Sequence, residues 1–151
     1  MTRSSSTTVL VLNGPNLNLL GSRQPEIYGT ASLDDHVTKL QGEAKKQGII
    51  VESFQSNSAS ELIDQIHKAR GLYAAIIINP GAFTHYAWSL SDALVAFDGP
   101  VVEVHLSNPS ARESWRHVSV IAPVAIGTIA GFGGHGYVLA MQAIVKHLAD
   151  A

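Results

Sequence analysis

The sequence contains no cysteine, which excludes disulfide bonds, cysteine-ligated zinc or iron–sulfur centres and thiol nucleophiles. It lacks any run near the ~18 consecutive apolar residues that a membrane-spanning helix needs. The polar residues 1–8 contain no apolar segment of the kind found in secretory signals. Neither charge sign dominates, since 10 Lys and Arg stand against 12 Asp and Glu, whereas nucleic-acid binding depends on clustered Lys and Arg. We therefore expect a cytoplasmic protein with neither a membrane nor a nucleic acid as partner.

The length and composition fit one globular domain. The chain has 151 residues, of which 46% are apolar and 15% are charged. One domain commonly takes ~100–200 residues, and a chain of this size can bury a core without covalent staples. We expect residues 1–8 to form a polar N-terminal tail and residues 9–151 to form a single domain.

Short apolar runs alternate with helical patterns along the chain. The run 73–78 is apolar on both faces, which is typical of a central parallel strand. Parallel strands need crossover helices, so the alternation predicts an α/β fold with helices on both faces of the sheet. Right-handed crossovers favour a flavodoxin-like three-layer sandwich with strand order 2-1-3-4-5. Strands are expected at 9–12, 49–54, 73–78, 101–104 and 118–122 (with 123–127 as a candidate extension), and helices at 32–46, 60–70, 87–97, 110–116 and 137–149.

Unusual polar side chains follow the carboxyl ends of three expected strands. In folds of this type, ligands bind at that edge of the sheet. Each residue taken alone is compatible with a turn or a solvated side chain. Their concentration on three neighbouring strands, while the opposite strand ends carry ordinary Gly and Pro stops, indicates a functional site. The residues are Asn13, Asn16, Asn18, Arg23 and Tyr28 after the first strand, Asn79, Thr84 and His85 after the third, and Glu103, His105, Ser107, Asn108, Arg112 and Arg116 at and after the fourth.

Several familiar chemistries do not fit these positions. A receiver domain needs acidic residues after its first and third strands, where this chain has Asn13 and Asn79. The segment 131–136 matches G-x-G-x-x-G, but the chain ends too soon after it for a dinucleotide-binding unit, so we interpret it as a tight helix entry. Glu103 and His105 are better explained as a supporting pair than as metal ligands. We expect no metal.

The side chains at this edge suit proton transfer next to a carbonyl group. None of the lysines lies there, which argues against Schiff-base catalysis. A tyrosine is a poor base at its usual pKa of ~10, but a nearby guanidinium stabilises the phenolate. Arg23, five residues before Tyr28, is a suitable partner. The loop 21–29 that carries both, bounded by glycines, is expected to act as a lid over bound substrate.

Long ordered motifs make the chain resemble a known enzyme family. They are Val11-Leu-Asn-Gly-Pro-Asn-Leu-Asn-Leu-Leu-Gly21, Arg23 through Tyr28-Gly29, Gln55-Ser-Asn57, Ile78-Asn-Pro-Gly-Ala82 with Thr84-His85, and Glu103-Val-His-Leu-Ser-Asn108. The chain resembles type II 3-dehydroquinate dehydratase from about residue 9 to the C-terminal helix. The resemblance implies cofactor-free loss of water from a carboxylate substrate, 3-dehydroquinate, in the shikimate pathway or in quinate breakdown.

The resemblance also implies residue roles. Tyr28 would remove a proton from the carbon next to the ketone, with Arg23 keeping this tyrosine anionic. Asn16 would help to bind the water that holds the enolate, and His105 would protonate the departing hydroxyl group. Asp92 matches a residue that reaches the site of an adjacent subunit in a trimer-based homododecamer. The positions matching family substrate contacts are Asn79, His85, Leu106, Ser107 and Arg116.

Two other functions remain as alternatives. A flavodoxin-like module that binds a flavin or another small anion would use the same edge of the sheet. It predicts aromatic side chains around a ring and a hydroxyl-rich phosphate loop after the first strand, where this chain has Asn13-Gly-Pro-Asn16. A catalytically inactive homologue kept for assembly would tolerate the loss of Tyr28 or His105, and both are present. We favour the dehydratase.

Overall fold

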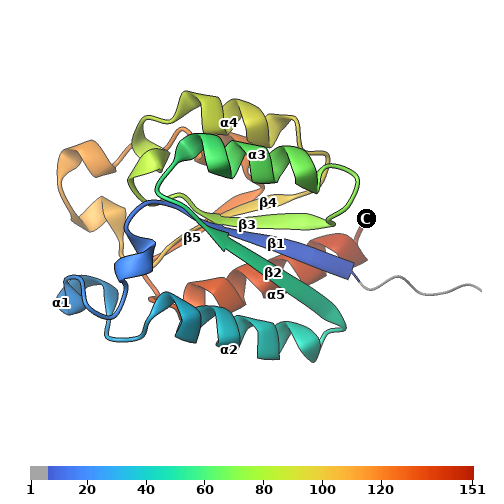
Figure 1. Ribbon diagram of the computed structural model, residues 1–151, viewed down its shortest axis with the longest axis horizontal. Coiled ribbons are helices and arrows are strands. Elements are labelled where there is room, and N and C mark those ends of the chain that lie inside the picture. The colour runs from blue at the N-terminus through green and yellow to red at the C-terminus, as the bar shows by residue number, and fades with distance from the viewer. Residues whose placement is uncertain (1–6) are drawn as a thin grey trace, which may run out of the picture.

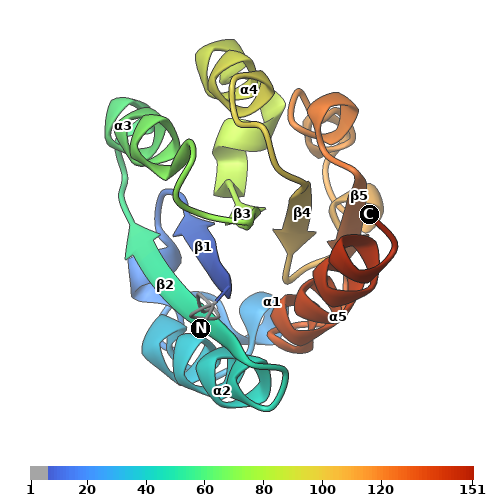
Figure 2. The ribbon, with the colours of Figure 1, turned by 90° about the vertical axis from the view of Figure 1, so that its right-hand side faces the viewer.

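A five-stranded parallel sheet forms the centre of the computed structural model, which describes residues 7–151. Every neighbouring pair of strands is parallel, and the strand order is β2-β1-β3-β4-β5, as the sequence predicts. Figure 2 shows the strands side by side in this order. The strands are β1 (Thr7–Asn13), β2 (Ile49–Gln55), β3 (Ala75–Asn79), β4 (Val101–His105) and β5 (Gly127–Ala130).

Helices cover both faces of the sheet (Figures 1 and 2). On one face lie α2 (Leu33–Lys45) and α5 (His135–Ala149), and on the other lie α3 (Ala59–Ala69) and α4 (Trp88–Val95). The short α1 (Pro25–Tyr28) lies beyond the carboxyl ends of the strands, at the left of Figure 1. Five 3₁₀ turns complete the described chain: Leu17–Leu19, Gly81–His85, Pro109–Ala111, Ser114–Arg116 and Ala122–Val124.

Local signals explain where the first two long helices begin. Ser32 and Asp35 form a capping box at the start of α2, with the Ser32 hydroxyl accepting from the Asp35 N–H. Ser58 caps α3, with its hydroxyl accepting from the Glu61 N–H at 3.4 Å, so α3 starts at Ala59, one residue earlier than expected. Capping side chains satisfy backbone N–H groups that have no partner within the helix, which is why these positions define the ends.

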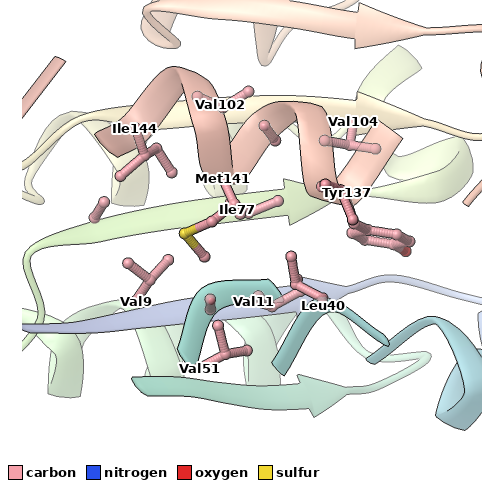
Figure 3. Packing of buried hydrophobic residues seen from close by; sticks show 14 of the residues in the cluster. Val9, Val11, Leu40, Val51, Ile77, Val102, Val104, Tyr137, Met141 and Ile144 are labelled. Carbon is pink, nitrogen blue, oxygen red and sulfur yellow. The ribbon is translucent and has the colours of Figure 1, made fainter. Parts of the chain in front are cut away.

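Two apolar clusters, one on each face, hold the layers together. Figure 3 shows the cluster on the α2 and α5 side, where Val11 and Ile77 from the sheet pack with Leu40 and Met141 from the helices. The opposite cluster joins Ile76 and Ile78 with α3 and α4. β3 is buried along its whole length, which explains why its residues on both faces are apolar from Ala75 to Ile78.

The fifth strand is not where the sequence predicts it. Residues 118–122 form no strand, and β5 is Gly127–Ala130. Val120 and Ile121 are buried because their loop packs into the α4-side cluster, which produces a strand-like apolar pattern without a strand. β5 lies at the sheet edge and is partly exposed, so its sequence carries no such pattern.

Other boundaries differ by a few residues. β1 starts at Thr7, so Thr7 and Thr8, which were expected in the tail, belong to the strand expected at 9–12. Residues 1–6 of the expected tail lie outside the described residues. The helix expected at 110–116 is two separate 3₁₀ turns.

Within residues 7–151, no helix combines the length and the apolar character needed to cross a membrane.

Candidate active site

A cavity of about 270 Å³ opens at the carboxyl ends of the strands. It is the meeting place of the loops after β1, β3 and β4, and nine of the ten site residues expected from the sequence line it. No acidic side chain lines it, whereas three arginines do, so the cavity suits an anion. The lining residues are Pro15, Asn16, Leu17, Arg23, Tyr28, Asn79, Gly81, Ala82, His85, His105, Leu106, Ser107, Pro109, Arg112 and Arg116.

Asn16 is held in a strained backbone conformation after β1. Its φ of 68° lies in the left-handed region, which non-glycine residues seldom adopt. The Asn57 side chain supports this turn, because its Oδ1 accepts from the Asn16 N–H at 3.0 Å and from Gln55 Nε2 at 3.2 Å. The motif after β2 thus positions the loop that carries Asn16 at the cavity.

Two guanidinium groups lie beside the Tyr28 side chain. Arg112 Nη1 donates to it at 2.9 Å, while the Arg23 guanidinium carbon lies 4.8 Å from the centre of its ring. The Arg112 guanidinium carbon is 5.4 Å from the same centre, and its Nη1 also donates to the Ser107 hydroxyl at 3.1 Å. Two positive charges therefore lie beside the Tyr28 side chain.

His105 is paired with a fully buried carboxylate. Its Nε2 donates to Glu103 Oε2 at 2.5 Å, which leaves Nδ1 as the ring nitrogen available to a ligand. Thr84 Oγ1 also donates to Glu103 Oε2 at 2.5 Å, and Ser119 Oγ donates to Oε1 at 3.0 Å. The expected pairing of Glu103 with His105 is therefore present.

The environment of Glu103 keeps it ionised. Burial raises the pKa of Glu103. The hydrogen bond and charge of His105 and the bonds from Thr84 and Ser119 lower it by more, so the pKa lies below its ordinary value. A buried carboxylate with four donors around it is a satisfied charge. Its hydrogen bond from Nε2 fixes the orientation of the His105 ring.

The remaining expected residues lie around these two groups. The His85 ring Nδ1 donates to the Val118 carbonyl oxygen at 2.7 Å and meets the Trp115 ring edge-on. Arg116 stacks over the same Trp115 ring, at 4.0 Å, and its Nε donates to Glu113. Leu106, which is buried, and Asn79, which is 2% exposed, also border the cavity.

Asp92 is the expected site residue that does not reach this cavity. It lies on α4 as an exposed residue and is absent from the cavity wall. Exposed large apolar side chains, Tyr86 at 61% and Trp88 at 69%, lie just before it in the chain.

The sequence predicts Arg23 as the partner of Tyr28, and Arg23 does lie over its ring. The sequence does not link Arg112 to this tyrosine. The structure gives Arg112 the hydrogen bond to the phenol, across 84 positions of the chain, and stacks Arg23 on the ring. The only available signal was the spacing of Arg112 and Arg116, which follow the fourth strand together. Thr84 is among the polar residues that follow the third strand, but nothing in the sequence indicates that Thr84 and Ser119 donate to Glu103.

The described residues, 7–151, contain no group of three or more His, Asp or Glu that could hold a metal ion. The site is thus made of arginines, amides, one phenol and a histidine–carboxylate pair. Such a set can bind a small carboxylate, remove a proton at one atom and donate one at another.

Comparison with known proteins gives one consistent family for this chain. Residues 7–145 match the family model for dehydroquinase class II. The chain is 51% identical over 143 residues to the 3-dehydroquinate dehydratase of Ruegeria pomeroyi, covering 95% of this chain and 96% of the relative. It is 56% identical over 136 residues to that of Dictyoglomus turgidum, covering 90% and 94%.

A solved structure gives the same result for the fold. The crystal structure of the type II dehydroquinase from Propionibacterium acnes superposes with a TM-score of 0.90 at 43% identity, covering 93% of this chain and 97% of that one. The resemblance detected in the sequence motifs is confirmed. The chain belongs to the class II dehydroquinase family.

Proposed function

We propose that the protein removes water from 3-dehydroquinate to give 3-dehydroshikimate, by an anti elimination through an enolate. One observation carries this proposal: Tyr28, flanked by Arg112 and Arg23, shares a cavity with the Glu103-supported His105. A base and an acid in one anion-binding cavity are what an elimination next to a ketone requires. The reaction belongs to the shikimate pathway.

In the first step, the Tyr28 phenolate takes a proton from the carbon next to the ketone. The electrons of that C–H bond move into the carbonyl group, which becomes an enolate. The guanidinium groups of Arg112 and Arg23 stabilise the phenolate before the transfer. Asn16, held at the cavity by Asn57, contributes to the water site that binds the enolate oxygen.

In the second step, the enolate re-forms the ketone and a carbon–carbon double bond, and the hydroxyl group on the next carbon leaves. His105 gives its Nδ1 proton to that hydroxyl, so the leaving group is water. The Glu103 carboxylate compensates the charge of the imidazolium that donates this proton. Tyr28 then loses its proton, and His105 regains one, before the next turnover.

The remaining lining residues bind the substrate. Three arginines in a cavity without acidic side chains favour its carboxylate. The Ser107 hydroxyl accepts from Arg112, and Leu106 and Ser107 both line the cavity, so their polar groups can complete such a site. Asn79, His85, Leu106, Ser107 and Arg116 are the proposed substrate contacts.

The elimination proceeds without a Schiff base. All the lysines of the sequence lie in residues 7–151, and none lines the cavity. Borohydride added together with 3-dehydroquinate should therefore leave the enzyme active, because there is no iminium ion to reduce. Covalent attachment of the substrate to a lysine, detected by mass spectrometry, would contradict this route.

Asp92 acts in the site of a neighbouring subunit, within a trimer-based homododecamer. Its distance from the cavity of its own chain is consistent with this role, because it lies exposed on α4. The exposed Tyr86 and Trp88 beside it provide apolar surface for a subunit contact.

The direct test is to mix the purified protein with 3-dehydroquinate and follow the ultraviolet absorbance of the conjugated enone product. We expect absorbance to rise in proportion to enzyme concentration, without added metal or cofactor. A folded protein that produces no enone at catalytic concentrations would refute the proposed activity.

A further inference from the structure

Tyr137, in the first turn of α5, has a buried hydroxyl group that joins the ends of β1 and β3. The side chain is 1% exposed. Its hydroxyl lies 2.5 Å from Asn13 Oδ1 and 3.1 Å from Asn79 Nδ2. Figure 3 shows the ring near the arrowhead ends of the strands, whereas Met141 and Ile144 lie further along α5. The helix thus reaches the amide that lines the cavity.

The order of donors along this chain of groups is fixed. An amide nitrogen can only donate, so Asn79 donates to the Tyr137 oxygen. A hydroxyl group has a single hydrogen, and this one is donated to Asn13 Oδ1. Asn13 therefore orients the hydroxyl of Tyr137, and that hydroxyl presents a lone pair to Asn79.

Asn13 is a polar side chain in a fully buried position, and the Tyr137 hydroxyl is the donor to its side-chain oxygen. It is 0% exposed, and its Nδ2 has no hydrogen-bond partner among the described residues. An apolar residue would avoid the cost of that unpaired donor. Without Asn13, however, the Tyr137 hydroxyl could rotate and donate to the oxygen of Asn79, which would allow the Asn79 amide to turn over.

We propose that Tyr137, oriented by Asn13, is a positioning residue that holds the Asn79 carboxamide in one orientation toward the substrate. The Asn79 oxygen accepts from the Gly81 N–H at 3.3 Å, so the amide is held at both ends. One N–H of Nδ2 remains for a ligand in the cavity that Asn79 lines. The role of Tyr137 in catalysis rests on the proposed function.

The surroundings suit a hydroxyl that never ionises. Burial raises the pKa of Tyr137 well above its ordinary value, so the group stays neutral and keeps both bonds at any working pH. The His36 ring packs against the Tyr137 ring, with centres 6.1 Å apart. Gly136 lets α5 approach the sheet, since a Cβ there would lie 3.3 Å from Val104 Cγ1.

The test compares Tyr137→Phe with Ile144→Ala, a matched control on the same helix and in the same apolar cluster. We expect Tyr137→Phe to lower kcat/KM for 3-dehydroquinate about tenfold, the usual effect of one lost hydrogen bond. Ile144→Ala should lower Tm but leave kcat/KM unchanged at temperatures where it is folded. Equal kinetic behaviour of the two variants would overturn the proposal.

A double-mutant cycle asks whether Tyr137 acts through Asn79. In an Asn79→Ala background, Tyr137→Phe should have less than about a twofold further effect on kcat/KM, because the amide it positions is gone. The same tenfold loss in both backgrounds would overturn the proposal. Asn13→Leu serves as the second variant if Tyr137→Phe does not fold, with the same expected dependence on Asn79.

A readout without substrate separates this inference from the proposed function. The side-chain amide signals of Asn79, observed by NMR, should shift in Tyr137→Phe and stay in place in Ile144→Ala. Unchanged Asn79 signals in Tyr137→Phe would overturn the positioning role even in an active enzyme. If the wild type makes no enone but the Asn79 signals still shift in Tyr137→Phe, the activity is refuted and the amide positioning stays in place.

Discussion

Two tyrosines of this chain show how surroundings decide what a side chain can do. Tyr28 is partly buried, and its hydroxyl accepts from Arg112 while the Arg23 guanidinium lies over its ring, so two positive charges lie beside it. Tyr137 is fully buried, and its contacts are neutral amides, an environment that opposes ionisation. The first is the proposed base, and the second is the proposed positioning residue.

Tyr28→Phe should lower kcat by at least about a hundredfold, since general base catalysis contributes ~10²–10⁴ in rate. The ring and its stacking on Arg23 remain, so we expect Tm to change little. Steady-state kinetics by the enone assay and a thermal melt measure the two effects. A variant with near-normal kcat would remove the base assignment.

Glu103 makes folding stability sensitive to acid. Its pKa in the folded protein is lowered from the ordinary 4.5, so the carboxylate stabilises the fold fully above that pH. The contribution is lost as pH falls through the lower, folded-state value. We therefore expect a wild-type melting temperature that decreases steeply below about pH 4.5, which is the ordinary value.

Glu103→Gln tests this source of acid sensitivity. The variant should be less stable than the wild type at pH 7 by about 1–3 kcal/mol, because charged hydrogen bonds are lost. Its melting temperature should then vary less between pH 3 and pH 5, a window around the ordinary value. Asp64→Asn, at an exposed position on α3, is the control and should keep the wild-type acid response. An unchanged acid response in Glu103→Gln would place the sensitivity elsewhere.

At the level of elements, the loops after β1 and β3 are packed directly against each other. The Gly14 N–H donates to the Asn79 carbonyl oxygen at 2.8 Å, and Gln55 Nε2 donates to the Gly14 oxygen at 3.1 Å. A Cβ on Gly14 would lie 2.3 Å from the Pro80 carbonyl oxygen. The strand ends can therefore present Asn16 and Asn79 to one cavity only while residue 14 has no side chain.

Gly14→Ala should destabilise the protein by about 1–3 kcal/mol, the usual cost of forcing a methyl group into packed structure. It should also lower kcat/KM, because the displaced loops carry cavity residues. Gly42→Ala is the matched control: this glycine lies inside α2 with open space around it, and alanine there should stabilise by about 0.5–1 kcal/mol. Chemical denaturation measures both, and equal stabilities would contradict the close approach.

At the level of the whole molecule, the position of Asp92 predicts a site shared between subunits. Asp92→Ala and Tyr28→Phe should each be nearly inactive on their own. Subunits of the two variants, unfolded, mixed and refolded together, should regain a fraction of wild-type activity, because some sites then receive Tyr28 from one subunit and Asp92 from another. The mass of the assemblies, compared with the 16.0 kDa subunit, verifies that mixed oligomers have formed. If such oligomers recover no activity, the two residues serve the same subunit or Asp92 has no role.

The sequence by itself determined the architecture and the location of the site. An apolar run on both faces at 73–78, alternating with helical patterns, requires a central parallel strand with crossover helices, and right-handed crossovers leave few strand orders. Polar residues after strands 1, 3 and 4 must then gather at one edge, because parallel strands end on the same side. Local patterns are sufficient for these conclusions because they depend on periodicity and chain direction alone.

Only the tertiary structure decided which side chains pair within the site. Arg112 reaches Tyr28 across 84 positions, and Tyr137 reaches Asn13 across 124, distances at which sequence spacing carries no information. The fifth strand was misplaced for a related reason: burial of residues 120 and 121 comes from loop packing, while the edge strand 127–130 is held by backbone pairing with β4. Hydrogen bonds and packing between distant segments depend on the closed three-dimensional arrangement, which no local pattern records.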